Sequence, residues 1–95
     1  MRNKLLYSFE DDLDERLKNP RFAREWRGLE LEYQIARQII RKRLALNYSQ
    51  RELAKKVKTT QAMISRLETM IANPSLELLK RIASALDTKV AIQFQ

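Results

Sequence analysis

Apolar residues recur three or four positions apart along most of the chain, and this spacing predicts a series of amphipathic helices. It divides the sequence into six expected helices, over about residues 9–18, 20–27, 30–46, 50–57, 61–69 and 76–86. Helix-capping residues support two of the expected helix starts. Ser49 and Glu52 match a capping box at the start of the fourth helix, and Thr60 directly precedes the fifth. The pattern therefore predicts a mainly α-helical chain.

The last residues of the chain follow a period of two instead. Val90, Ile92 and Phe94 alternate with other side chains, which predicts a β-strand over residues 89–94. A lone strand in a helical domain leaves backbone groups unpaired along its edge. Pairing with the same strand of a second copy, or with a partner protein, would satisfy these groups, and the simplest expectation is a homodimer. A second, weaker strand signal covers residues 5–7.

The composition excludes several kinds of chemistry. The sequence has no cysteine and no histidine, which rules out disulfides, thiolate nucleophiles, Cys/His metal sites and histidine acid–base catalysis. It has one glycine, Gly28, and so no glycine-rich phosphate loop. We therefore expect no enzyme, no metal and no other cofactor.

Length and hydropathy favour one small globular domain with a short appendage. The chain has 95 residues, of which 44% are hydrophobic. No stretch approaches the roughly 20 apolar residues that cross a bilayer, and the first residues lack the apolar core of a signal peptide. The expected location is the cytoplasm.

The positive charge is unevenly distributed. The net charge is +7, and residues 31–95 carry all of it, with twelve of the nineteen Lys/Arg but only five of the twelve Asp/Glu. Residues 1–30 are balanced. The second part of the chain is therefore the candidate for a polyanionic partner, although a solvated basic surface without a partner would have the same composition.

Two short helices joined by a tight turn, over about residues 50–69, match a helix-turn-helix motif. Ala54 supplies the small residue where the helices cross, and Ile64 and Leu67 would attach the second helix to the domain. The outer face of that helix would carry a set of side chains suited to reading base edges in the major groove of double-stranded DNA, namely Gln61, Ala62, Ser65 and Arg66.

The stretch SQRELAKKVKTTQAMISRLE, residues 49–68, closely resembles the Cro/C1-type (XRE) helix-turn-helix domains of lambdoid phage repressors. The likeness extends over about residues 37–86. It implies a five-helix, lambda-repressor-like fold over residues 37–91, followed by a dimerisation strand over residues 89–94. One departure is Lys58, which stands in the turn where the family usually has glycine, so we expect a positive φ at a lysine.

The resemblance also implies roles for individual residues. Gln61 would read a base, and Ser65 and Arg66 would face the groove. Arg43 and Glu68 would form a structural ion pair that fixes the angle of the recognition helix. Phosphate contacts and positioning are expected from the residues that open the two motif helices, Gln50, Arg51, Thr59 and Thr60.

Residues 1–30 form an expected helical extension that a minimal domain of this family does not require. The order NPRF (residues 19–22), LEYQIAR (residues 31–37), helix-turn-helix and apolar strand resembles the HigA-type antitoxins of type II toxin–antitoxin modules. That resemblance implies a DNA-binding autorepressor that also neutralises a small basic ribonuclease toxin, with Phe22 and Trp26 as candidate toxin contacts. The alternatives are a phage-type or orphan regulator without a toxin, a protein-binding module that no longer binds DNA, and an extension that only enlarges the core.

Overall fold

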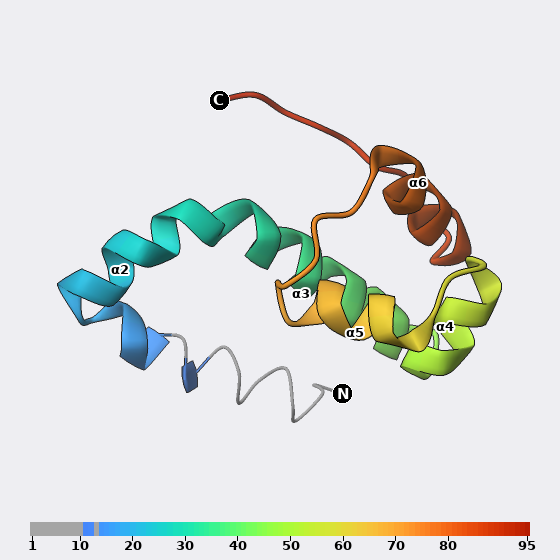
Figure 1. Ribbon diagram of the computed structural model, residues 1–95, viewed down its shortest axis with the longest axis horizontal. Helices are drawn as coiled ribbons and strands as arrows, with labels where there is room; N and C mark the ends of the chain where they lie inside the picture. The colour runs from blue at the N-terminus through green and yellow to red at the C-terminus, as the bar shows by residue number, and fades with distance from the viewer. Residues whose placement is uncertain (1–10, 13) are drawn as a thin grey trace.

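The computed structural model describes residues 11–12 and 14–95, and this part of the chain is mainly α-helical, as predicted. Residues 11–12 and 14–17 are helical. The elements that follow are α2 (Pro20–Trp26), the 3₁₀ helix η1 (Arg27–Leu29), α3 (Glu30–Ala45), α4 (Gln50–Lys56), α5 (Gln61–Glu68) and α6 (Leu76–Ala85) (Figure 1). The expected strand over residues 5–7, and Phe9 and Leu13 of the first expected helix, lie outside the described residues.

Polar side chains define where the helices begin. Asn19 Oδ1 accepts a hydrogen bond from the backbone N–H of Arg21 at 2.9 Å, and Pro20 occupies the first position of α2. The capping box at α4 is complete, because Ser49 Oγ accepts from Glu52 N at 3.0 Å and Glu52 Oε1 accepts from Ser49 N at 3.1 Å. Side chains of Thr60 and Ser75 cap α5 and α6 in the same way.

Each of the helices α3 to α6 is followed, two positions after its last residue, by a residue in the left-handed region, and none of these residues is glycine. Their φ angles lie between 56° and 64°. The next backbone N–H then bonds to the carbonyl five residues earlier, as in a Schellman motif. The left-handed residues are Asn47, Lys58, Met70 and Asp87. The positive φ expected at Lys58 is therefore confirmed.

The core lies among α3, α4, α5 and α6. Leu53, Ile64 and Ile82 are its largest fully buried side chains, and Ala54 is buried where α4 meets α5. In contrast, α2 has no buried residue and lies at the opposite end of the molecule from α4 and α6 (Figure 1). The 3₁₀ helix η1, which contains Gly28, separates α2 from α3, so the two α-helices end and begin close to the expected bounds at residues 27 and 30. We call α2, η1 and the first two turns of α3 the arm.

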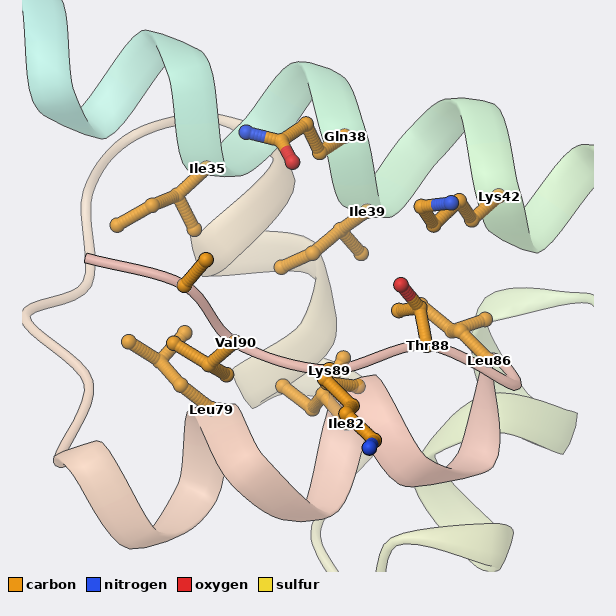
Figure 2. Close-up of a pocket in the computed structure, with 12 residues that line it drawn as sticks. Ile35, Gln38, Ile39, Lys42, Leu79, Ile82, Leu86, Thr88, Lys89 and Val90 are labelled. Atoms are coloured by element: carbon orange, nitrogen blue, oxygen red, sulfur yellow. The ribbon is translucent and has the colours of Figure 1, made fainter. Parts of the chain in front are cut away.

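The predicted C-terminal strand is not found. Residues 88–95 have no regular secondary structure, and no strand is assigned in residues 11–12 and 14–95. The physical reason is that a strand needs a hydrogen-bonding neighbour, and this single chain offers none to the tail. The tail instead crosses the gap between α3 and α6, where Val90 lies near Leu79 (Figure 2). Beyond this point Ile92 is 66% exposed and Phe94 is 94% exposed.

Candidate nucleic-acid interface

Helix α5 has one buried face and one exposed polar face. Ile64 and Leu67 are 0% and 2% exposed, and they pack into the core against α3 and α4. The opposite side carries four side chains predicted to read bases. Gln61, Ala62 and Arg66 are exposed, and Ser65 is half-buried. The helix can therefore present polar groups outward without disturbing the core.

The N-terminus of α4 lies next to the N-terminus of α5. Arg51 Nε donates a hydrogen bond of 3.4 Å to Gln61 Oε1 across the two helices. Thr60 Oγ1 accepts from the backbone N–H of Met63 at 3.1 Å and caps α5, and Thr59 is half-buried in the turn before it. The structure thus brings together three of the residues predicted to contact or position phosphates and one predicted to read a base.

An ion pair fixes α5 against α3. Arg43 donates from Nε to Glu68 Oε2 at 2.7 Å and from Nη2 to Glu68 Oε1 at 3.0 Å. The two side chains are only 12% and 6% exposed. Arg43 Nη1 also donates to the carbonyl oxygen of Tyr48 at 2.8 Å, which ties the loop before α4 to the same guanidinium. The pair implied by the family resemblance is therefore present.

Gln50 has a role that the sequence did not indicate. Its Nε2 donates at 3.0 Å to Glu68 Oε1, the oxygen that also accepts from Arg43 Nη2, and this bond joins α4 to the Arg43–Glu68 pair. The side chain is half-buried in this position. The amide nitrogen is thereby engaged inside the protein, and the expected phosphate contact of Gln50 stays a prediction. Nothing in the spacing of residues 43, 50 and 68 could have revealed the contact, because it depends on how three helices cross.

The charge around the two motif helices is predominantly positive. Lys55, Lys56 and Lys58 are exposed along the second half of α4 and the turn, in addition to Arg51 and Arg66. Lys56 Nζ lies 4.8 Å from the centre of the Tyr48 ring, a cation–π distance. Of the two acidic residues in this stretch, Glu68 is neutralised by its ion pair. The surface is therefore electrostatically suited to a polyanion.

Glu52, the second acidic residue of the two motif helices, uses its carboxylate in the capping box at the start of α4. The hydrogen bond from the Ser49 backbone N–H, followed by the Ser49 side chain and the positive charge of Lys56, holds the pKa of Glu52 below its ordinary value. These contacts favour the carboxylate over the neutral acid. The group therefore remains ionised at neutral pH and stabilises the start of α4.

The candidate contact residues of the arm form a small aromatic cluster. The rings of Phe22 and Trp26 stack at 6.1 Å between centroids, and Trp26 meets Tyr33 edge-on at 5.0 Å. All three side chains are half-buried, so each retains accessible surface. Tyr33 was not singled out from the sequence. Its position seven residues after Trp26, two helical turns, was the available signal.

Other kinds of site are not found in the described part of the chain. Residues 11–12 and 14–95 contain no group of three or more acidic, histidine or cysteine side chains placed to hold a metal ion. Among the same residues, no helix has the length and apolar character that crossing a membrane requires.

Comparison with known proteins assigns the family. A helix-turn-helix family model, HTH_3, matches residues 39–92, which is more than half of the chain. A search of curated proteins and a search of solved structures each gave no match. The matched region contains α4 and α5 and most of the core described above. The chain therefore belongs to the Cro/C1-type helix-turn-helix family of DNA-binding transcription regulators.

Proposed function

We propose that the protein is a sequence-specific transcriptional repressor that inserts α5 into the major groove of its operator. The observation that carries this proposal is the two-sided character of α5. Its inner face is fixed by Ile64, Leu67 and the Arg43–Glu68 pair, and its outer face presents Gln61 and Arg66 to solvent. Folding accounts for the inner residues, whereas the side chains of the outer pair are exposed and contribute nothing to the core. An exposed helix of this kind fits the dimensions of the major groove.

The chemistry of the outer face supports base recognition. Arg66 can form a bidentate contact with guanine, and Gln61 and Ser65 can exchange hydrogen bonds with base edges. The methyl group of Ala62 can contact thymine. Phosphates on either side would be met by Arg51, Thr59 and Thr60, and by backbone N–H groups at the start of α4. No step of this function requires a cofactor or catalysis.

We also propose that the repressor acts as a homodimer on an inverted repeat. The support is the tail, where Val90, Ile92 and Phe94 stay at least 36% exposed and the backbone has no strand to pair with. Antiparallel pairing with the tail of a second copy would bury these side chains and satisfy the backbone. Two α5 helices related by the dimer axis would then lie about 34 Å apart, one turn of B-DNA.

The experiment is a mobility-shift assay with DNA from the region upstream of the gene. We expect the full chain to bind and the double variant Gln61→Ala with Arg66→Ala to lose binding by on the order of a hundredfold, because each base contact contributes about 1–3 kcal/mol. The matched control is Gln34→Ala with Arg24→Ala. It removes the same two residue types at exposed positions on α3 and α2. Equal losses in both variants would contradict the assignment of α5 as the reading helix.

A second proposed activity is the neutralisation of a small basic ribonuclease toxin, as the resemblance to HigA-type antitoxins implies. It is supported by the accessible Phe22–Trp26–Tyr33 cluster on the arm. Acidic side chains also gather at the start of the described chain and are exposed, namely Asp11, Asp12, Asp14 and Glu15. Two of these carboxylates pair within the same stretch, Asp12 with Arg16 at 3.1 Å and Glu15 with Lys18 at 3.2 Å. Aromatic anchors together with exposed carboxylates suit a basic protein partner.

Co-expression separates this activity from the alternative of a regulator without a toxin. The chain is expressed with the product of a neighbouring reading frame that encodes a small basic protein, and co-purification is measured. We expect a stable complex that Phe22→Ala with Trp26→Ala weakens, while DNA binding by the double variant is unchanged. If no neighbouring product binds, the stand-alone regulator is the better description, and the repressor proposal is unaffected.

A further inference from the structure

A hollow of about 140 Å³ lies between α3, α6 and the tail. Its inner wall is apolar, because Ile35 and Ile39 extend from α3 into the gap (Figure 2). Leu79 and Ile82 of α6 face them, and Val90 of the tail lies between the two helices. Ile82 is 1% exposed and Val90 is 36% exposed, so the hollow leads from the core to the surface beside the tail.

The rim of the hollow is polar and positively charged. Four polar side chains contribute to it, Gln38, Lys42, Thr88 and Lys89, and no acidic side chain lines the hollow. The hydroxyl of Thr88 points towards α3, on the side where Lys42 lies (Figure 2). No hydrogen bond or ion pair joins any of these four side chains to another described residue. An anionic group at the rim could therefore use their donors without displacing an internal partner.

The size of the hollow limits the apolar part of a ligand. An apolar cavity of roughly 150 Å³ holds one benzene ring, so a body of about six carbon atoms fits here. Sites for drug-sized ligands and cofactors start at about 300 Å³, and such molecules are too large for this space. At the rim, a carboxylate can accept hydrogen bonds from ammonium, amide and hydroxyl groups at the same time.

We propose that the hollow binds a small apolar monocarboxylate, whose hydrocarbon body lies between α3 and α6. Its carboxylate accepts from Lys42, Thr88 and Lys89 at the rim. This site goes beyond DNA binding and does not depend on it. Residues 88–91 of the tail form one wall of the hollow. A bound molecule would therefore favour the arrangement in which the start of the tail lies against the domain.

The test is an NMR titration of the full chain in the absence of DNA. It follows the backbone amide signals while benzoate or hexanoate is added, and benzamide and hexanamide serve as uncharged molecules of the same size. We expect both acids to shift the signals of lining residues such as Gln38, Thr88 and Val90. Both acids should also raise the temperature of unfolding, because they bind the folded chain. The amides should bind more weakly, since they lack the charge that the lysines attract.

Variants separate the charge at the rim from the apolar wall. Lys42→Met with Lys89→Met should weaken binding of the acids by about tenfold and leave the amides unchanged, because one exposed ion pair contributes up to about fivefold. The matched control is Lys55→Met with Lys80→Met, which removes two exposed lysines outside the hollow and should change neither. Ala83→Leu enlarges a side chain that lines the hollow and should abolish the shifts from acids and amides alike, with the helical circular dichroism retained.

Three results would overturn the proposal. Neither acid shifts the lining signals at millimolar concentration, or the shifts spread over lysines across the whole surface, or the control variant loses as much affinity as the rim variant. Lining signals that respond to protein concentration and not to the acids would assign the hollow to a second copy of the chain, which also overturns it. The repressor proposal is unaffected by any of these results, since the mobility-shift assay tests it separately.

Discussion

Arg43 in α3 and Glu68 at the end of α5 are 25 residues apart in sequence and form an ion pair with two hydrogen bonds, Nε to Oε2 at 2.7 Å and Nη2 to Oε1 at 3.0 Å. The pair lies at the junction of the core with the exposed reading helix. Buried ion pairs are poor sources of net stability, because removing two charges from water offsets much of their attraction. Their directional bonds do restrict geometry, and here they restrict the angle between α3 and α5.

Removing one partner of this pair should be costly. Glu68→Ala leaves the Arg43 guanidinium, which is 12% exposed, without its carboxylate, and we expect a loss of about 3–5 kcal/mol in the free energy of unfolding. Urea denaturation followed by circular dichroism measures it. The double variant Arg43→Met with Glu68→Met should recover most of the loss, because no unpaired charge remains. Glu25→Ala, at an exposed position of α2, should change stability by less than about 0.5 kcal/mol. A double variant less stable than Glu68→Ala would contradict this view.

Lys58 should be replaceable by glycine with a gain in stability. Its φ of 58° is unfavourable for a side chain with a Cβ, and glycine adopts it freely. We expect Lys58→Gly to raise the free energy of unfolding by about 0.4–1 kcal/mol, read from the denaturant midpoint. Lys55→Gly is the control, since it removes the same side chain from inside α4 and should destabilise by about 1 kcal/mol. A midpoint that falls for both variants would show that Lys58 is not strained.

The capping box should make part of the folding stability sensitive to acid. The folded pKa of Glu52 is lowered, so its stabilising effect is complete above the ordinary glutamate pKa and is lost as the pH falls through the lower, folded value. Glu52→Gln has no ionisable group at this position. We therefore expect the wild-type chain to be the more stable of the two at neutral pH, with the difference shrinking in acid. Thermal unfolding of both proteins between pH 7 and pH 3 checks this, and a constant difference would contradict it.

The tail offers a test of the proposed dimer that does not touch α5. Ile92 is 66% exposed in the single chain, so Ile92→Asp should leave the fold intact while preventing two tails from pairing. We expect sedimentation to show a monomer and operator affinity to fall on the order of a hundredfold, because two linked half-site contacts become one. Gln93→Asp adds the same charge at the neighbouring position and should have a smaller effect on both measurements. An unchanged dimer in Ile92→Asp would exclude the tail as the interface.

Local features of the fold were accessible from the sequence. The helices between Pro20 and Ala85 and the capping box at Ser49 depend on residues close together in the chain. The positive φ of Lys58 was expected from the family resemblance, because the family usually has glycine at this position. The buried face of α5 was also predictable, because Ile64 and Leu67 are three positions apart. The base-reading side chains predicted to lie on its other face are exposed or half-buried there, and their contacts with DNA stay a prediction.

The remaining features depend on relations that one sequence does not encode locally. The bonds from Gln50 to Glu68 and from Arg51 to Gln61 arise from the crossing of separate helices and from side-chain rotamers. The strand over residues 89–94 was predicted from the alternation of apolar and other side chains. Such alternation indicates that a segment can pair as a strand, but a strand forms only where a neighbouring strand is present to accept and donate its hydrogen bonds. The single described chain accordingly leaves this segment without regular structure.

Helix α3 runs without interruption from the aromatic cluster at Tyr33 to the guanidinium of Arg43. Its sixteen residues form a helix about 24 Å long, whose first two turns belong to the arm and whose last turn carries Arg43, the partner of Glu68 in α5. If a ligand bound at the first turn tilts α3 as a rigid body, Arg43 moves with the helix and displaces α5 through its ion pair with Glu68. Thermodynamic linkage is reciprocal. If such a ligand changes the affinity of the protein for its operator by some factor, the operator changes the affinity for the ligand by the same factor.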